Sequence, residues 1–235
     1  MKTIPRAERL IVALDVPSAE AAKSLVQRLG DSTSFYKIGL QLFMADGYFG
    51  LIDWLARQGK KVFVDLKFFD VPETVGAAVR GLRGRGVTFA TVHGNQPILE
   101  AAGKEKGEVK ILAVTALTSL DQGDLEDLGF QCDIQKLVLS RARRALEAGC
   151  DGVISSGLEA PLLKRELGGR LLVVTPGIRP VQNRPSDDQK RTVDVAQAFA
   201  NGADYIVVGR PIHQASDPRA AALGIQATIA AVFPA

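Results

Sequence analysis

The chain has 235 residues, of which 46% are hydrophobic and 23% charged, a composition that excludes disordered, fibrous and disulfide-scaffold proteins. Its 29 Lys and Arg residues against 26 Asp and Glu give a formal net charge of +3, too small an excess to indicate nucleic-acid binding. The chain has two cysteines without CxxC spacing, and its N-terminus does not resemble a signal peptide. It also has no apolar run of roughly 18 residues, so we predict a cytoplasmic protein without a membrane partner.

Short β-branched runs alternate with longer amphipathic stretches along the whole chain. We predict eight strands, at Leu10–Asp15, Phe35–Gly39, Val62–Leu66, Val87–His93, Lys110–Thr115, Gly152–Ser155, Leu171–Thr175 and Tyr205–Val208. Most are near-continuous hydrophobic runs, which is typical of parallel strands buried on both faces. We predict helices between and after them at Ala19–Leu29, Phe49–Gln58, Glu73–Arg83, Ile134–Ala148, Val193–Ala200 and Pro218–Val232.

Eight such units in an undivided chain of this length favour a single (β/α)₈ TIM barrel, with residues 1–235 as one domain. A doubly wound parallel sheet is the alternative, since it shares the alternation but not the count of eight. In a barrel the carboxyl ends of the strands meet at one mouth, where active sites are built. Polar residues or glycine follow many of the predicted strands at this end: Asp15, Lys37, Asp65, Lys67, His93, Thr115, Thr175 and Gly209.

The sharpest local signal is the segment VDLKFFDVP, which places three charges around the end of the third predicted strand. Asp65 and Lys67 are two residues apart, so a regular strand points both to the same side, and Asp70 follows in the turn. A salt bridge at an exposed strand edge is the alternative. Because the strand is otherwise apolar and charged side chains are rarely buried unless paired, the pattern favours a functional site.

Lys37 is a second charge inside a strand-like run, FYKIG. If the second and third strands are neighbours, Lys37 meets Asp65 and Lys67 at the mouth, and such an alternating array keeps its members ionised. The alternative for Lys37 alone is a lysine with a buried apolar stem whose ammonium reaches solvent.

Two loops near the end of the chain predict an anion site. TPGIRP follows the seventh predicted strand and VGRP follows the eighth, and barrels often bind phosphate between these two loops. Gly209 permits close approach of the backbone, and Arg210 offers paired donors to phosphate oxygens. An ordinary turn is the alternative for Gly209.

The loop from Gly177 to Gln189 is long, polar and rich in Pro, Asn and Asp, which is typical of a lid or binding loop. Gln189 either donates to a ligand or lies in solvent. Asp15 either accepts hydrogen bonds from sugar hydroxyls or caps the next turn. We interpret His93 as a structural residue near the mouth and His213 as a surface residue.

The sequence has no GxGxxG, GxxxxGK[ST], HExxH or GxSxG motif, and it has two histidines. We therefore predict that the protein uses no nucleotide cofactor and no metal.

The motifs LIVALD, FYKIGL, VFVDLKFFDVPETV, LAVTALTS, TPGIRP, DDQKR and IVVGRPI occur in this order over nearly the whole chain. In this pattern the chain resembles the orotidine 5′-monophosphate decarboxylases of the short bacterial type. The resemblance implies cofactor-independent decarboxylation of orotidine 5′-monophosphate (OMP) to uridine 5′-monophosphate (UMP) and CO₂, the last step of de novo pyrimidine biosynthesis. It also implies a homodimer with shared active sites.

The family's charged network corresponds to Lys37, Asp65, Lys67 and Asp70. The resemblance implies that Lys67 stabilises a carbanion at C6 and then protonates it, and that Asp70 is supplied to the site of the neighbouring subunit. The residues implied to bind the substrate are Asp15, Lys37, Thr74, Thr118, Arg179, Gln189, Gly209 and Arg210. Asp15 and Thr74 would contact the ribose, and Thr118 the pyrimidine. The phosphate would be held by Gln189, Gly209 and Arg210, and Arg179 lies in the same loop as Gln189.

Two other functions remain open from the sequence. One is a related phosphate-binding barrel that uses Mg²⁺ as a sugar-phosphate synthase or decarboxylase, although an acid in place of Lys37 would suit a metal better. The other is a catalytically silent barrel that only binds a nucleotide or a protein. The charged residues disfavour it, because unused buried charges are costly.

Overall fold

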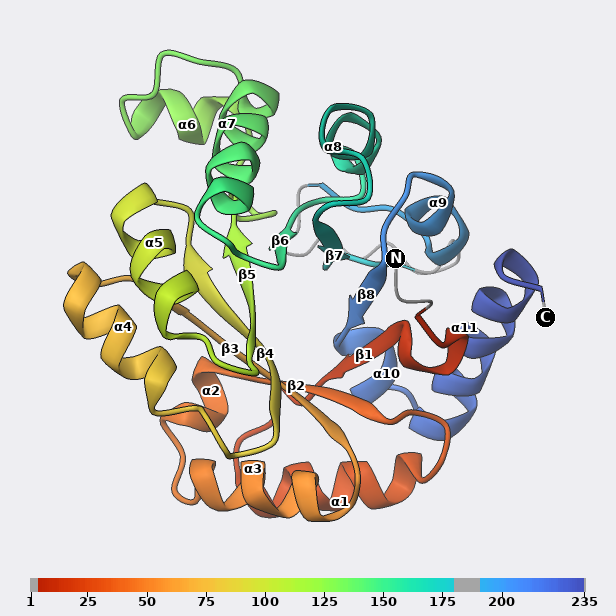
Figure 1. Ribbon diagram of the computed structural model, residues 1–235. Coiled ribbons are helices and arrows are strands. Elements are labelled where there is room, and N and C mark those ends of the chain that lie inside the picture. Colours follow the sequence, from red (N-terminus) through yellow and green to blue (C-terminus); the bar gives the residue numbers. More distant parts are fainter. Residues whose placement is uncertain (1–3, 180–190, 235) are drawn as a thin grey trace.

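The computed structural model describes residues 4–179 and 191–234. Eight parallel strands form a closed barrel in chain order, with β8 paired to β1 (Figure 1). The strands are β1 Leu10–Ala13, β2 Phe35–Gly39, β3 Lys61–Phe68, β4 Val87–His93, β5 Lys110–Val114, β6 Gly152–Ile154, β7 Leu172–Thr175 and β8 Tyr205–Val208. The predicted (β/α)₈ barrel is confirmed, and the doubly wound sheet is excluded.

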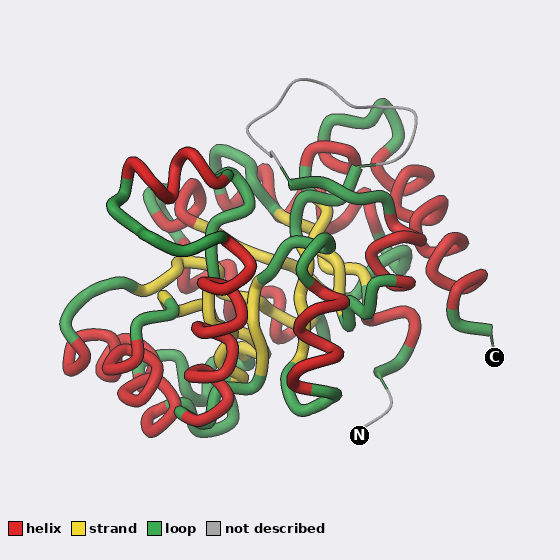
Figure 2. The backbone as a smooth tube through the Cα atoms, turned by 90° about the horizontal axis from the view of Figure 1, so that it is seen from above, coloured by secondary structure: helices red, strands yellow, loops and turns green. Residues whose placement is uncertain are grey.

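Helices surround the barrel on its outside (Figures 1 and 2). They are α1 Ala19–Leu29, α2 Leu40–Phe43, α3 Tyr48–Arg57, α4 Pro72–Arg80, α5 Gln96–Glu105, α6 Gln122–Asp127, α7 Ile134–Glu147, α8 Ala160–Leu167, α9 Val195–Ala200, α10 Arg210–His213 and α11 Pro218–Val232, and a 3₁₀ turn, η1 Arg6–Glu8, precedes β1. Several helices begin at a capping side chain, since Ser18, Asp133 and Asp217 each accept a hydrogen bond from a backbone N–H of the first turn. Within the described ranges, no helix combines the length and apolar character needed to cross a membrane.

Aromatic rings fill the inside of the barrel at its amino end. Phe35 and Tyr205 are the first residues of β2 and β8, and Phe63 and Phe89 lie with them in one buried cluster. The ring centroid of Phe89 lies 5.1 Å from that of Phe35 and 5.2 Å from that of Tyr205. Because these rings occupy the amino end, the carboxyl-end mouth is left for a site.

The strand boundaries differ from the prediction mainly at the carboxyl ends. β1 ends at Ala13, so Asp15 lies in the loop that follows. β3 continues to Phe68, two residues beyond the predicted end at Leu66, and its pairing with β4 shifts register on the way. These differences fall where residues leave the regular ladder and turn toward the mouth.

Candidate active site

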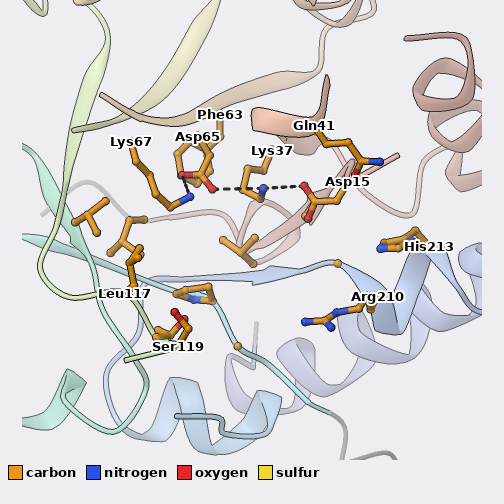
Figure 3. Close-up of a pocket in the computed structure, with 18 of the residues that line it drawn as sticks. Asp15, Lys37, Gln41, Phe63, Asp65, Lys67, Leu117, Ser119, Arg210 and His213 are labelled. Carbon is orange, nitrogen blue, oxygen red and sulfur yellow. Dashed lines mark hydrogen bonds and ion pairs between the residues drawn. The ribbon is translucent and has the colours of Figure 1, made fainter. Parts of the chain in front are cut away.

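A cavity of about 510 Å³ lies at the mouth of the barrel (Figure 3). Most of the residues predicted for the site line it: Asp15, Lys37, Asp65, Lys67, Thr118, Arg179, Gly209 and Arg210. They come from β2 and β3 and from the loops after β1, β5, β7 and β8, which closure of the barrel brings together. This cavity is therefore the candidate active site.

Four of these side chains form a row of alternating charge (Figure 3). Lys37 Nζ lies 3.1 Å from Asp15 Oδ1 and 3.4 Å from Asp65 Oδ2. The other carboxylate oxygen, Asp65 Oδ1, lies 3.0 Å from Lys67 Nζ. Asp65 is thus held between two ammonium groups, and Lys67, with a side chain 32% exposed, ends the row at the cavity.

Burial and ion pairing act in opposite directions on the two central groups of the row. Burial acts to lower the pKa of Lys37, but the carboxylates of Asp65 and Asp15 outweigh it and hold this pKa above its ordinary value. Burial acts to raise the pKa of Asp65, but Lys37 and Lys67, together with hydrogen bonds from Lys67 and Thr91, bring it below its ordinary value. Both groups are therefore ionised at neutral pH.

Lys67 has a left-handed backbone conformation, with φ at 49°. This conformation is uncommon outside glycine and costs about 1–3 kcal/mol. The register between β3 and β4 shifts between Val64 and Phe68, so Lys67 lies in an irregular part of the strand. The side chains of Asp65 and Lys67 point to the same cavity, as predicted, but the backbone between them departs from regular strand alternation.

Thr91 of β4 holds this irregular segment in place. Its fully buried hydroxyl accepts a hydrogen bond from the Lys67 backbone N–H and donates one to Asp65 Oδ1, both at 2.9 Å. One side chain therefore fixes the backbone of Lys67 and one oxygen of its ion-pair partner. Thr91 was not predicted as a site residue, because its only signal in the sequence is a hydroxyl inside an apolar strand.

Replacing Thr91 by valine, which has the same shape, is expected to lower the free energy of unfolding by about 1–3 kcal/mol, because the Lys67 backbone N–H and Asp65 Oδ1 each lose a hydrogen bond. Denaturant unfolding measures this change. Thr88→Val on the same strand is the matched control, since Thr88 is only partly buried, and it should change stability by less than about 0.5 kcal/mol. Equal losses in both variants would contradict the role given to Thr91.

The far end of the cavity is built by α10, which follows β8 and Gly209 directly. Arg210 and His213 both line the cavity there, away from Lys67 (Figure 3). The prediction of His213 as a surface residue is wrong, because the short turn of α10 brings its half-buried ring to the cavity. Burial lowers the pKa of His213, Asp15 opposes this and Arg210 adds to it, so the pKa lies below its ordinary value.

The wall formed by the β5–α6 loop contains Leu117 and Ser119 on either side of the buried Thr118. Gln41, in α2, lines the cavity near Asp15 (Figure 3). Of these residues, only Thr118 was predicted from the sequence. The signal for the others was their position next to residues already predicted at the mouth.

Three predicted residues are not placed in the cavity of this chain. Asp70 is exposed, and its Oδ1 accepts a hydrogen bond from the backbone N–H of Val71 at 2.6 Å. Thr74 is exposed on α4. Gln189 lies outside the described residues, as does most of the loop from Gly177 to Gln189. His93, which we interpret as a structural residue, packs its ring in a tilted arrangement on that of Phe69, with centroids 4.5 Å apart.

The closed barrel with a charged row at its mouth defines an enzyme of the (β/α)₈-barrel class. The chain belongs to the orotidine 5′-phosphate decarboxylase / HUMPS family, whose model matches residues 8–225. A relative from Methylococcus capsulatus named orotidine 5′-phosphate decarboxylase is 69% identical, covering 100% of this chain and 97% of the relative. One of the same name from Xanthomonas euvesicatoria is 52% identical, covering 97% of this chain and 94% of the relative.

A solved structure agrees with these relatives. The crystal structure of orotidine 5′-phosphate decarboxylase from Lactobacillus acidophilus is 36% identical, has a TM-score of 0.83, and covers 94% of this chain and 99% of its own. The Mg²⁺-dependent sugar-phosphate alternative finds no support in the names of these relatives. In residues 4–179 and 191–234, no three His, Cys, Asp or Glu side chains form a group that could hold a metal ion.

Proposed function

We propose that this chain decarboxylates OMP to UMP and CO₂, the last step of de novo pyrimidine biosynthesis, without a cofactor. The observation that carries the proposal is the row Asp15–Lys37–Asp65–Lys67 at the barrel mouth. It occurs in a chain that is 69% identical, over its whole length, to a relative named for this reaction.

The chemistry requires electrostatic stabilisation by the protein. When the bond from C6 to the carboxylate breaks, its electron pair stays on C6 in an orbital orthogonal to the ring π system, and CO₂ leaves. Fixed positive charge is the remaining way to stabilise that pair. Lys67, at the cavity end of the row, provides this charge and then donates a proton from Nζ to C6, regaining it from solvent.

The rest of the row keeps Lys67 oriented. Asp65 holds the Lys67 ammonium at 3.0 Å, and Lys37 on the other side of Asp65 keeps that carboxylate ionised. Because these charges are fixed before the substrate arrives, little reorganisation is needed as charge develops at C6.

The other residues predicted for the site bind the remaining parts of the nucleotide. The phosphate lies at the end formed by Gly209 and Arg210, where Arg210 supplies donors beside the β8 end, with Gln189 and Arg179 completing this grip. Asp15 and Thr74 contact the ribose, and Thr118 contacts the pyrimidine. The residues proposed to bind the substrate are thus Asp15, Lys37, Thr74, Thr118, Arg179, Gln189, Gly209 and Arg210.

The active form is proposed to be a homodimer of the single-domain chain 1–235, in which Asp70 and Thr74 complete the site of the partner subunit. An exposed apolar surface beside these two residues supports this arrangement. Large side chains that are 44% to 82% exposed follow the neighbouring strands β2 and β3: Leu40, Phe43, Met44, Phe69 and Val71. Large exposed apolar patches commonly mark interfaces.

The direct test follows the ultraviolet absorbance of OMP with purified protein, with and without EDTA. We expect conversion to UMP at a rate that chelation does not change. Absence of turnover with OMP, or loss of turnover in EDTA that Mg²⁺ restores, would contradict the proposal. Sugar phosphates with Mg²⁺ would then be the next substrates to assay.

A further inference from the structure

A buried ion pair lies behind the wall of the cavity, outside the charged row. Arg191 Nη1 lies 2.6 Å from Glu159 Oε1, and the two side chains are only 8% and 4% exposed. Neither residue lines the cavity. Glu159 directly precedes α8, and Arg191 lies between β7 and α9. The pair therefore joins the loop after β6 to the loop after β7 at the barrel mouth.

Arg191 also holds the third loop of this side, the one after β5. Its Nη2 donates to the carbonyl of Leu117 at 2.9 Å, and its backbone N–H lies 3.4 Å from the carbonyl oxygen of Thr118. Leu117, Thr118 and Ser119 all line the cavity. The position of this wall therefore depends on a guanidinium group that does not touch the cavity itself.

The segment that begins at Arg191 also supports Arg179. The backbone N–H of Arg179 donates to the carbonyl of Val193 at 3.0 Å, and Ile178 pairs with Val193 as an isolated parallel bridge. Val193 packs so closely on Gly157 that a Cβ there would lie 2.5 Å from Val193 Cγ2. Loops after β5, β6 and β7 thus meet around one short segment.

The pair is an expensive way to provide stability alone. Within the described residues, Arg191 Nε and Glu159 Oε2 are buried without a hydrogen-bond partner. Buried ion pairs are often replaced by apolar residues without loss of stability, whereas removal of one partner alone is strongly destabilising. A role in positioning the loops that line the cavity would explain why a charged pair lies here.

We propose that Arg191, neutralised by Glu159, is a positioning residue for the decarboxylation: it fixes the wall Leu117–Ser119 and the backbone of Arg179 relative to the charged row. This inference rests on the proposed function, since it takes the cavity as the OMP site. Errors of about 1 Å in the placement of groups around a substrate can reduce a rate by about 100-fold.

The test is the double variant Glu159→Leu/Arg191→Met, which removes both charges and keeps apolar volume. We expect its melting temperature to equal or exceed that of the wild type, while kcat/KM for OMP falls by about 100-fold, most of it in kcat. The split between stability and turnover is the decisive result, because a pair that serves stability alone would not produce it.

Lys164→Met is the matched control. Lys164 Nζ lies 2.7 Å from Asp204 Oδ2, in a partly buried pair just before β8, at the opposite end of the barrel. This variant should have a lower melting temperature than the wild type. Its kcat/KM should stay within about twofold of the wild-type value, since a substitution far from the site is expected to act independently of it. Arg191→Lys keeps the charge beside Glu159 but lacks the fork that reaches Leu117, and it should lose about 10-fold or more in kcat/KM.

An active wild type with an equally active double variant would overturn the inference and leave the proposed function intact. If the double variant does not fold, Arg191→Lys decides, and wild-type kcat/KM in that variant would overturn the inference. A wild type that does not turn over OMP would instead contradict the proposed function.

Discussion

Lys67→Ala is expected to lower kcat/KM for OMP by about 10⁴-fold or more and to leave UMP binding largely intact. Two contributions disappear together, the fixed positive charge beside C6 and the proton donor, and each is typically worth about 10²–10⁴-fold. Asp65 keeps its contacts with Lys37 and Thr91, so the rest of the row stays in place. UMP has neither the carboxylate that leaves nor the charge that develops at C6, so its affinity depends little on Lys67.

Steady-state assays with OMP and calorimetric titration with UMP measure the two effects. Lys61→Ala is the matched control, because Lys61 belongs to the same strand but pairs with Glu8 at its amino end, outside the cavity. It should keep kcat/KM within about twofold, as most surface substitutions have small effects. Turnover by Lys67→Ala at more than about one hundredth of the wild-type rate would remove Lys67 from its proposed role.

The barrel could be predicted from the sequence because its strands are buried on both faces. Largely apolar runs such as those at Phe35–Gly39 and Val87–His93 indicate such strands without regular alternation, and both predicted ranges match the structure. The charged residues of the row were equally visible, since Lys37 and Asp65 interrupt apolar runs and closure of the barrel makes their strands neighbours.

What the sequence did not predict depends on contacts between distant segments. The left-handed conformation of Lys67 is held by Thr91, 24 residues away on the next strand. The pair of Arg191 and Glu159 joins loops 32 residues apart. Local sequence patterns do not indicate such contacts. The position of His213 was predicted wrongly because a helix as short as α10 has too few residues to show which side faces the cavity.

A mixture of two inactive variants, Lys67→Ala and Asp70→Ala, is expected to regain activity. If Asp70 completes the site of the partner subunit, a heterodimer of the two variants has one site with both defects and one site with neither. Random pairing at equal amounts makes half of the dimers heterodimers, so about one quarter of all sites would be intact. Each variant alone should have less than about one hundredth of wild-type activity, because its sites lack one member of the charged network.

The measurement requires subunit exchange, achieved by coexpression with two affinity tags and isolation of the doubly tagged dimer, in which one site of every two should be intact. The matched control pairs Lys67→Ala with Asp65→Ala. Asp65 and Lys67 form their 3.0 Å ion pair within one chain, so this heterodimer has one defect in each site and should stay inactive. Recovery in the control as well would show that the assay reports contamination. A doubly tagged Lys67→Ala/Asp70→Ala dimer without activity would mean that Asp70 does not act across the interface, since each site would then contain one of the two substitutions.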